Sequence, residues 1–116
     1  MTNPLKGQVE VSLGTETYKC RLTIDSLIKI ENELDMGILG IATKMANAEV
    51  RIHELFVVLR YALRGGGNDI DQKELFKIIE GAGIVEASKA VAQLLADVLS
   101  DPNEKKKQAE AEAQMT

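Results

Sequence analysis

The stretch QVEVSLGTETYKCRLTI, residues 8–24, decides the fold class, because apolar and polar residues alternate along both of its halves. A period of two places the apolar residues on one face of a strand, and residues 14–17 supply a short turn in which Gly14 can take a positive φ. The alternating apolar residues are Val9, Val11 and Leu13 in the first strand and Tyr18, Cys20, Leu22 and Ile24 in the second. A two-stranded hairpin alone is marginally stable in water, so its apolar face must pack on other elements.

From about residue 23 the apolar period becomes that of a helix, and capping residues and glycines divide the chain into five helices. We expect them from Thr23 or Asp25 to near Gly37, from Ile38 to about Ala46, from about Ile52 to Arg64, from Asp71 to Gly81 or Gly83, and from about Ile84 to Leu99. The sequence predicts a single α+β domain over residues 1–101, with an N-terminal β-hairpin packed on a bundle of about five short helices. Residues 102–116 start at a proline and are highly charged, so we expect a disordered tail or a frayed helix.

The expected third helix is more apolar than a surface helix needs to be. One stripe of it carries Ile52, Leu55, Phe56, Leu59 and Leu63, and three further apolar or aromatic residues lie outside this stripe, namely Val57, Val58 and Tyr61. A helix that is apolar around most of its circumference is central in its fold or keeps one side for a partner. We predict that Val57, Val58 and Tyr61, with Met45 of the preceding helix, belong to a surface that binds another protein.

Glu31 lies at the edge of the apolar stripe that Leu27 and Leu34 define on the first helix. Burial of an unpaired carboxylate costs several kcal/mol, so this side chain needs a partner. That partner is a structural ion pair, a backbone hydrogen bond, or another protein. Glu31 therefore joins the candidate protein-binding residues.

Composition restricts the classes of partner. The chain has 116 residues, a net charge of −4 and 45% hydrophobic residues. It has no basic field that would concentrate nucleic acid or anionic lipid, and no apolar run long enough to span a membrane. The N-terminal sequence MTNPLKGQVE lacks the apolar core of a signal peptide, so we expect a cytoplasmic protein, or one assembled into a larger particle from the cytoplasm.

The stretch GGGNDIDQKELF, residues 65–76, is the part of the chain that most resembles a ligand-binding motif. If Glu74 took the last position of a calcium-binding EF-hand loop, the earlier ligand positions would fall on Leu63, Gly65 and Gly67, which have no side-chain oxygen. A phosphate loop would need Gly-Lys-Ser/Thr, whereas Asn-Asp follows the glycines here. We therefore interpret the stretch as a tight turn followed by a helix that Asp71 and Glu74 cap.

No residue set supports catalysis, a metal or a cofactor. His53 is the only histidine and Cys20 the only cysteine, so an ordinary zinc site cannot form within one chain. We expect His53 at the surface or at a helix cap, and Cys20 as a small buried thiol. There is no nucleophile–histidine–acid pattern and no dinucleotide-binding glycine motif, so we predict that the protein is not an enzyme.

The order of these segments resembles a family of small tail proteins of gene transfer agents, which is grouped with phage tail assembly chaperones. The N-terminal similarity covers NPLKGQVEVSLGTETYKCRLTIDSLIKIENELDMGILGI, with a second strand that ends in Arg-Leu-Thr and a helix of the pattern L-x-x-(L/I)-E-x-x-L from Leu27 to Leu34. Further along, HELFVVLRYALRGG resembles the apolar helix of the family, and DIDQKELFKIIEGAGIVEASKAVAQLLADVL resembles its two closing helices. The similarity spans roughly residues 3–100. The triple glycine at 65–67 departs from the family, whose members often carry a polar or acidic run there.

This resemblance implies a role in building the tail of a phage or phage-like particle, with no catalytic residues. Tail assembly chaperones bind the long tape-measure protein until tail tube subunits polymerise around it. The resemblance thus implies tape-measure and tail tube proteins as partners, and self-association stays open. Two alternatives also stay open: a structural subunit of the finished tail, and a small regulatory module that binds a cellular protein.

Overall fold

The computed structural model describes residues 8–100. These form two strands, β1 (Gln8–Leu13) and β2 (Glu16–Arg21), and five helices. The helices are α1 (Ile24–Leu34), α2 (Ile38–Ala46), α3 (Ile52–Gly65), α4 (Gln72–Ala82) and α5 (Ile84–Leu99). An α+β fold in which an N-terminal hairpin packs on five helices is thereby confirmed. The predicted tail at residues 102–116 lies outside the described residues.

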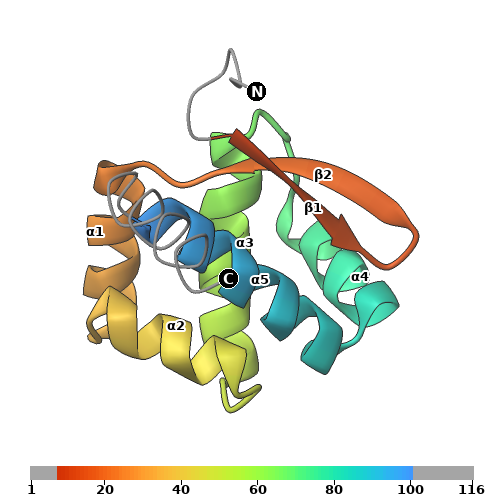
Figure 1. The fold of residues 1–116 in the computed structure, drawn as a ribbon. Coiled ribbons are helices and arrows are strands. Elements are labelled where there is room, and N and C mark those ends of the chain that lie inside the picture. Colours follow the sequence, from red (N-terminus) through yellow and green to blue (C-terminus); the bar gives the residue numbers. More distant parts are fainter. Residues whose placement is uncertain (1–7, 101–116) are drawn as a thin grey trace, which may run out of the picture.

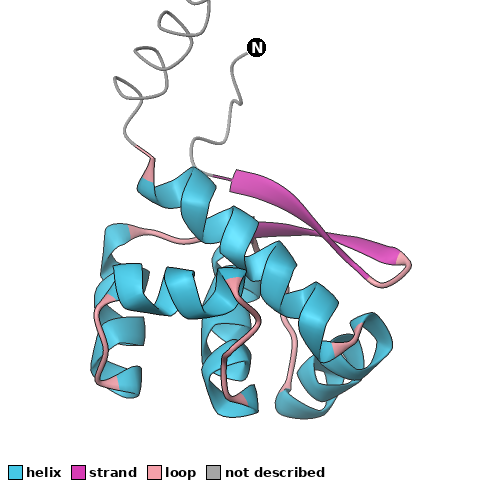
Figure 2. Cartoon of the chain, turned by 60° about the horizontal axis from the view of Figure 1, so that its bottom comes forward, coloured by secondary structure: helices cyan, strands magenta, loops and turns pink. Residues whose placement is uncertain are grey.

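Helix α3 stands in the middle of the fold, with α1 and α2 on one side, α4 on the other and the hairpin across one end (Figure 1). Helix α5 passes diagonally between α2 and the hairpin and contacts both (Figure 2). The two central helices α3 and α5 therefore carry much of the core, and the remaining elements cover them.

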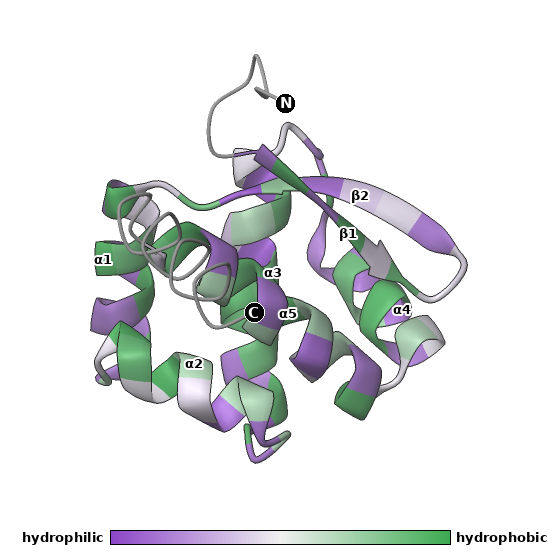
Figure 3. Cartoon of the chain, viewed as in Figure 1, coloured by the Kyte–Doolittle hydropathy of each residue, from purple (hydrophilic) through white to green (hydrophobic). Residues whose placement is uncertain are grey.

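The strands pair antiparallel, with Val11 opposite Tyr18 and Val9 opposite Cys20. The turn is shorter than the expected residues 14–17, because Glu16 and Thr17 belong to β2. Gly14 takes a φ of 70° in the turn, as a short hairpin turn requires. One face of the hairpin is buried against the helices, whereas the outer surface of β2 is polar (Figure 3). Ile24 does not continue the second strand, because Thr23 caps α1 through a hydrogen bond from the Ser26 N–H to the Thr23 Oγ1, 3.1 Å long.

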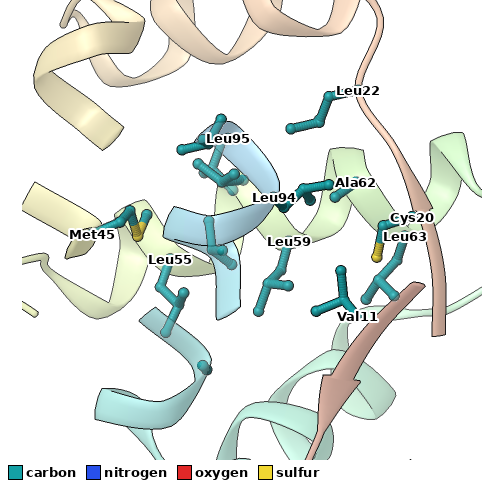
Figure 4. Packing of buried hydrophobic residues seen from close by; sticks show 14 of the residues in the cluster. Val11, Cys20, Leu22, Met45, Leu55, Leu59, Ala62, Leu63, Leu94 and Leu95 are labelled. Carbon is teal, nitrogen blue, oxygen red and sulfur yellow. The ribbon is translucent and has the colours of Figure 1, made fainter. Parts of the chain in front are cut away.

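The core joins side chains from every layer (Figure 4). Met45 of α2, Leu59 of α3 and Leu94 of α5 lie inside it with Val11 and Cys20 of the hairpin. All five are at most 6% exposed. Burial of one aliphatic side chain contributes about 1.5–3 kcal/mol, so this cluster holds the hairpin against the helices.

The glycine turn after α3 docks directly against the main chain of β2. A Cβ atom added at Gly65 would overlap the Arg21 carbonyl oxygen, and one at Gly66 would overlap that of Lys19. The Asn68 side chain donates to the Lys19 carbonyl oxygen at 2.7 Å. The next helix begins with the predicted cap, in which the Asp71 side chain accepts from the Glu74 N–H at 2.8 Å. The stretch 65–76 is therefore a structural junction between β2, α3 and α4.

The first helix ends slightly earlier than the sequence predicts, which is near Gly37. It stops at Leu34, and Asp35 takes a left-handed conformation with a φ of 51°. Gly37, expected as the helix end, instead precedes α2 as its N-cap. Aspartate is one of the few residues besides glycine that adopts this conformation at modest cost.

Candidate protein-binding surface

Three of the five residues predicted to bind a partner lie inside the core. Met45, Val57 and Val58 are each 0% exposed. Helix α3 is apolar around most of its circumference because β2, α1, α4 and α5 all pack on it. The expectation that Met45, Val57 and Val58 lie on an exposed surface is therefore corrected.

Glu31 forms a backbone hydrogen bond, which is one of the roles that the sequence left open. Its Oε2 accepts from the Ile38 N–H at 2.8 Å. This bond satisfies an amide in the first turn of α2, where the N-cap is Gly37 and has no side chain to do so. Glu31 therefore joins the end of α1 to the start of α2.

Tyr61 is half-buried and belongs to a network on the outer side of α3. Its hydroxyl donates to Glu33 Oε1 at 2.6 Å. The Arg60 guanidinium donates to both carboxylate oxygens of Glu33, at 2.8 and 2.9 Å. The hydrogen bond from Tyr61, with the charge and hydrogen bond of Arg60, holds the pKa of Glu33 below its usual range, and the same bond to Glu33 raises the pKa of Tyr61. These contacts fix the direction of Arg60 across the helix surface.

Arg60 connects Tyr61 to an aromatic pair. Its guanidinium carbon lies 5.2 Å from the centre of the Tyr61 ring and 5.8 Å from that of Phe56. The rings of Phe56 on α3 and Phe76 on α4 are 5.1 Å apart, within the range of favourable aromatic pairs. Phe76 is nevertheless 49% exposed.

One turn earlier on α3, Ile52 is 59% exposed. Ile52, Phe56 and Arg60 follow one another at intervals of four residues, so they share one face of the helix. We call Ile52, Phe56, Arg60, Tyr61 and Phe76 the aromatic surface. It contains both phenylalanines and one of the two tyrosines of a chain that has no tryptophan.

Of this set, the sequence predicts Tyr61 as a binding residue and assigns Ile52 and Phe56 to the main apolar stripe of the helix. The four-residue spacing of Ile52, Phe56 and Arg60 is the signal that marks a second face of α3. Nothing in the sequence reveals that Phe76 of the next helix joins it, because that contact depends on how α3 and α4 pack.

A small pocket beside the aromatic surface has a volume of about 100 Å³. It is lined by Phe56, Ile70 and Leu75, and Arg60 and Arg64 also border it. Small-molecule sites usually occupy roughly 300–1,000 Å³, so this pocket suits one side chain of a partner better than a substrate.

The remaining candidate residues fit structural roles. Burial raises the pKa of the Cys20 thiol to about 11, so it stays protonated at neutral pH. His53 is exposed in the first turn of α3. Within residues 8–100, no three His, Cys, Asp or Glu side chains gather in a way that could hold a metal ion. No helix in this same range is long and apolar enough to cross a bilayer.

Comparison with known proteins identifies the family. A family model described as "Phage tail tube protein, GTA-gp10" matches residues 6–101. No curated protein and no solved structure matches the chain. The family is one of phage tail assembly chaperones and is not enzymatic. Because the match covers most of the sequence and the whole of the described fold, the chain belongs to the phage tail assembly chaperone family that includes GTA-gp10.

Proposed function

We propose that this protein is a tail assembly chaperone that binds the tape-measure protein in the host cytoplasm, through the aromatic surface of α3 and α4. The observation that carries the proposal is the exposure of Ile52 and Phe76, at 59% and 49%, next to Phe56 and Arg60. Aromatic residues and arginine are enriched at the centres of protein interfaces, where they account for much of the binding energy.

The charges around this surface indicate which kind of segment fits it. On the outer side of α3, Arg60 and Arg64 accompany Ile52 and Phe56, in a chain whose net charge is −4. Arg60 is paired with Glu33, whereas Arg64 has no ion pair among the described residues. An amphipathic helix would complement this surface, with its apolar stripe on Ile52 and Phe56 and its acidic flanks near the arginines. Helical segments of a tape-measure protein are the partner that family membership supports.

Co-expression tests this function. A candidate tape-measure protein from the same genome is produced with and without this chain, and its soluble fraction is measured. A chaperone should raise the soluble fraction and elute with the tape-measure protein in size-exclusion chromatography. An equal soluble fraction in both cultures, with separate elution, would contradict the proposal.

A second candidate function is a structural subunit of the finished tail, because the family description contains the words "tail tube protein". Mass spectrometry of purified particles distinguishes the two functions. A chaperone should be absent from mature particles, whereas a tube subunit should be present in many copies per particle.

A further inference from the structure

Within residues 8–100, the outer edge of β1 carries main-chain groups that no strand pairs with. In the part of the chain that the structure describes, the sheet has two strands, so β1 has one neighbour there, β2. Leu13 and Glu16 flank the two-residue turn and form a hydrogen-bonded pair. Along an antiparallel ladder, hydrogen-bonded pairs alternate with pairs whose N–H and C=O groups point outward. Glu10 and Ser12 fall between these pairs, so their N–H and C=O groups point away from β2.

The equivalent edge of β2 is covered. The Lys19 carbonyl oxygen, which points outward from β2, accepts from the Asn68 side chain at 2.7 Å. Gly65 and Gly66 press against the same edge. Within residues 8–100, no tertiary main-chain hydrogen bond reaches Glu10 or Ser12, and both residues are exposed. The described residues therefore cover one edge of the hairpin and leave the other open.

A groove of about 240 Å³ lies between this open edge and α5. Its walls include the apolar side chains of Val9, Val11 and Leu94. Two acidic residues, Glu10 and Asp97, also line it, and neither forms an ion pair with a described residue. Figure 2 shows β1 and α5 side by side, in line with the contacts between them.

We propose that the edge of β1 binds an extended, basic segment of a partner protein, which adds to the hairpin as a third strand. Main-chain hydrogen bonds to Glu10 and Ser12 would provide the pairing, and alternate apolar side chains would lie over the groove. Lysine or arginine residues of the segment would face Glu10 and Asp97. A second copy of this chain suits the edge less well, because β1-to-β1 pairing brings acidic residues together. This site is separate from the aromatic surface. It would bind an extended strand, whereas the aromatic surface would bind a helix.

A synthetic peptide of alternating valine and lysine, carrying a fluorescent label, is the probe for this site. Its binding to the full chain is measured by fluorescence anisotropy, with a peptide of alternating valine and glutamate as the charge control. We expect the lysine peptide to bind at least about 10-fold more tightly at low salt, and the difference to shrink as salt is added.

Ser12→Pro tests the pairing. Proline removes the outward N–H of Ser12 but no hydrogen bond of the hairpin ladder, and prolines are tolerated at such edge positions. We expect it to weaken binding by about 10-fold. Thr17→Pro is the matched control, because Thr17 lies opposite Ser12 and its N–H points outward from β2. Ser12→Ala removes only the side chain, and neither control should change binding.

Hydrogen exchange of the unaltered protein provides a second measurement, in case Ser12→Pro unfolds the chain. The lysine peptide should protect the amides of Glu10 and Ser12 from exchange. Equal binding of both peptides, or no protection of these amides at a saturating peptide concentration, would overturn the proposal. Protection that grows with protein concentration in the absence of peptide would also overturn it, since a second copy would then occupy the edge.

Discussion

Glu54 is the only charged side chain that is buried among residues 8–100, with 7% of its surface exposed. Its carboxylate accepts from Lys44 Nζ at 2.8 Å and from the Arg51 N–H at 2.8 Å. Burial alone would raise the pKa of Glu54, but the bonds from Arg51 and Lys44 outweigh it and hold the pKa below the usual 4.5. The carboxylate thus joins the end of α2 to the first turn of α3.

Glu54→Gln should destabilise the fold by about 1–3 kcal/mol at neutral pH, because it removes the charge that faces Lys44. A carboxyl group with a lowered pKa contributes stability above pH 4.5 and loses that contribution as pH falls through the lowered value. The melting temperature of the variant should therefore drop less than that of the parent between about pH 7 and about pH 3. Equal drops in thermal unfolding followed by circular dichroism would contradict this role.

Gly66 shows how one residue without a side chain decides where the hairpin docks. Gly66→Ala should destabilise the fold by about 2 kcal/mol or more, because the new Cβ would overlap the Lys19 carbonyl oxygen. Gly81→Ala is the matched control in α4, where no atom lies within 4 Å of an added Cβ. This control should stabilise the protein by about 0.5–1 kcal/mol, since alanine favours a helix over glycine. Urea unfolding of both variants measures the difference, and similar values for the two would contradict the close packing.

At the scale of single elements, α3 combines a buried body with an exposed strip. Val58 is 0% exposed and Ile52 is 59% exposed on the same helix. Val58→Ala should cost about 1–3 kcal/mol through lost burial and the cavity left behind. Ile52→Ala should change the free energy of unfolding by less than about 0.5 kcal/mol. Chemical denaturation checks both values, and a larger loss for Ile52→Ala would show that this residue belongs to the core.

Local sequence patterns predict the hairpin and the helix positions well, because alternation, caps and glycines act within a few residues. The bounds of α2 and α5 agree with those expected from the sequence. The same patterns did not reveal which sides of α3 are covered. A helical stripe defines one apolar face of a helix. Val57 and Val58 are buried because β2, α1, α4 and α5 pack on the other sides of α3, which the sequence of α3 does not show.

For the molecule as a whole, the described residues combine a closed core with two surfaces built from different elements. The aromatic surface belongs to α3 and α4, with Phe56 and Phe76 at 5.1 Å, and the open strand edge belongs to β1 beside α5. Neither surface resembles a catalytic site. Recognition of other proteins is the activity that family membership and both surfaces support.

The most direct test of this account is co-purification of the tape-measure protein with the Phe76→Asp variant. Leu39→Asp on α2 is the matched control, because Leu39 is an exposed apolar residue at 70% but lies outside the aromatic surface. Both variants should fold like the parent, since neither side chain is buried. We predict that Phe76→Asp lowers the amount of co-purified tape-measure protein at least about 10-fold and that Leu39→Asp leaves it unchanged. Full retention by a folded Phe76→Asp variant would contradict the assignment of the chaperone function to this surface.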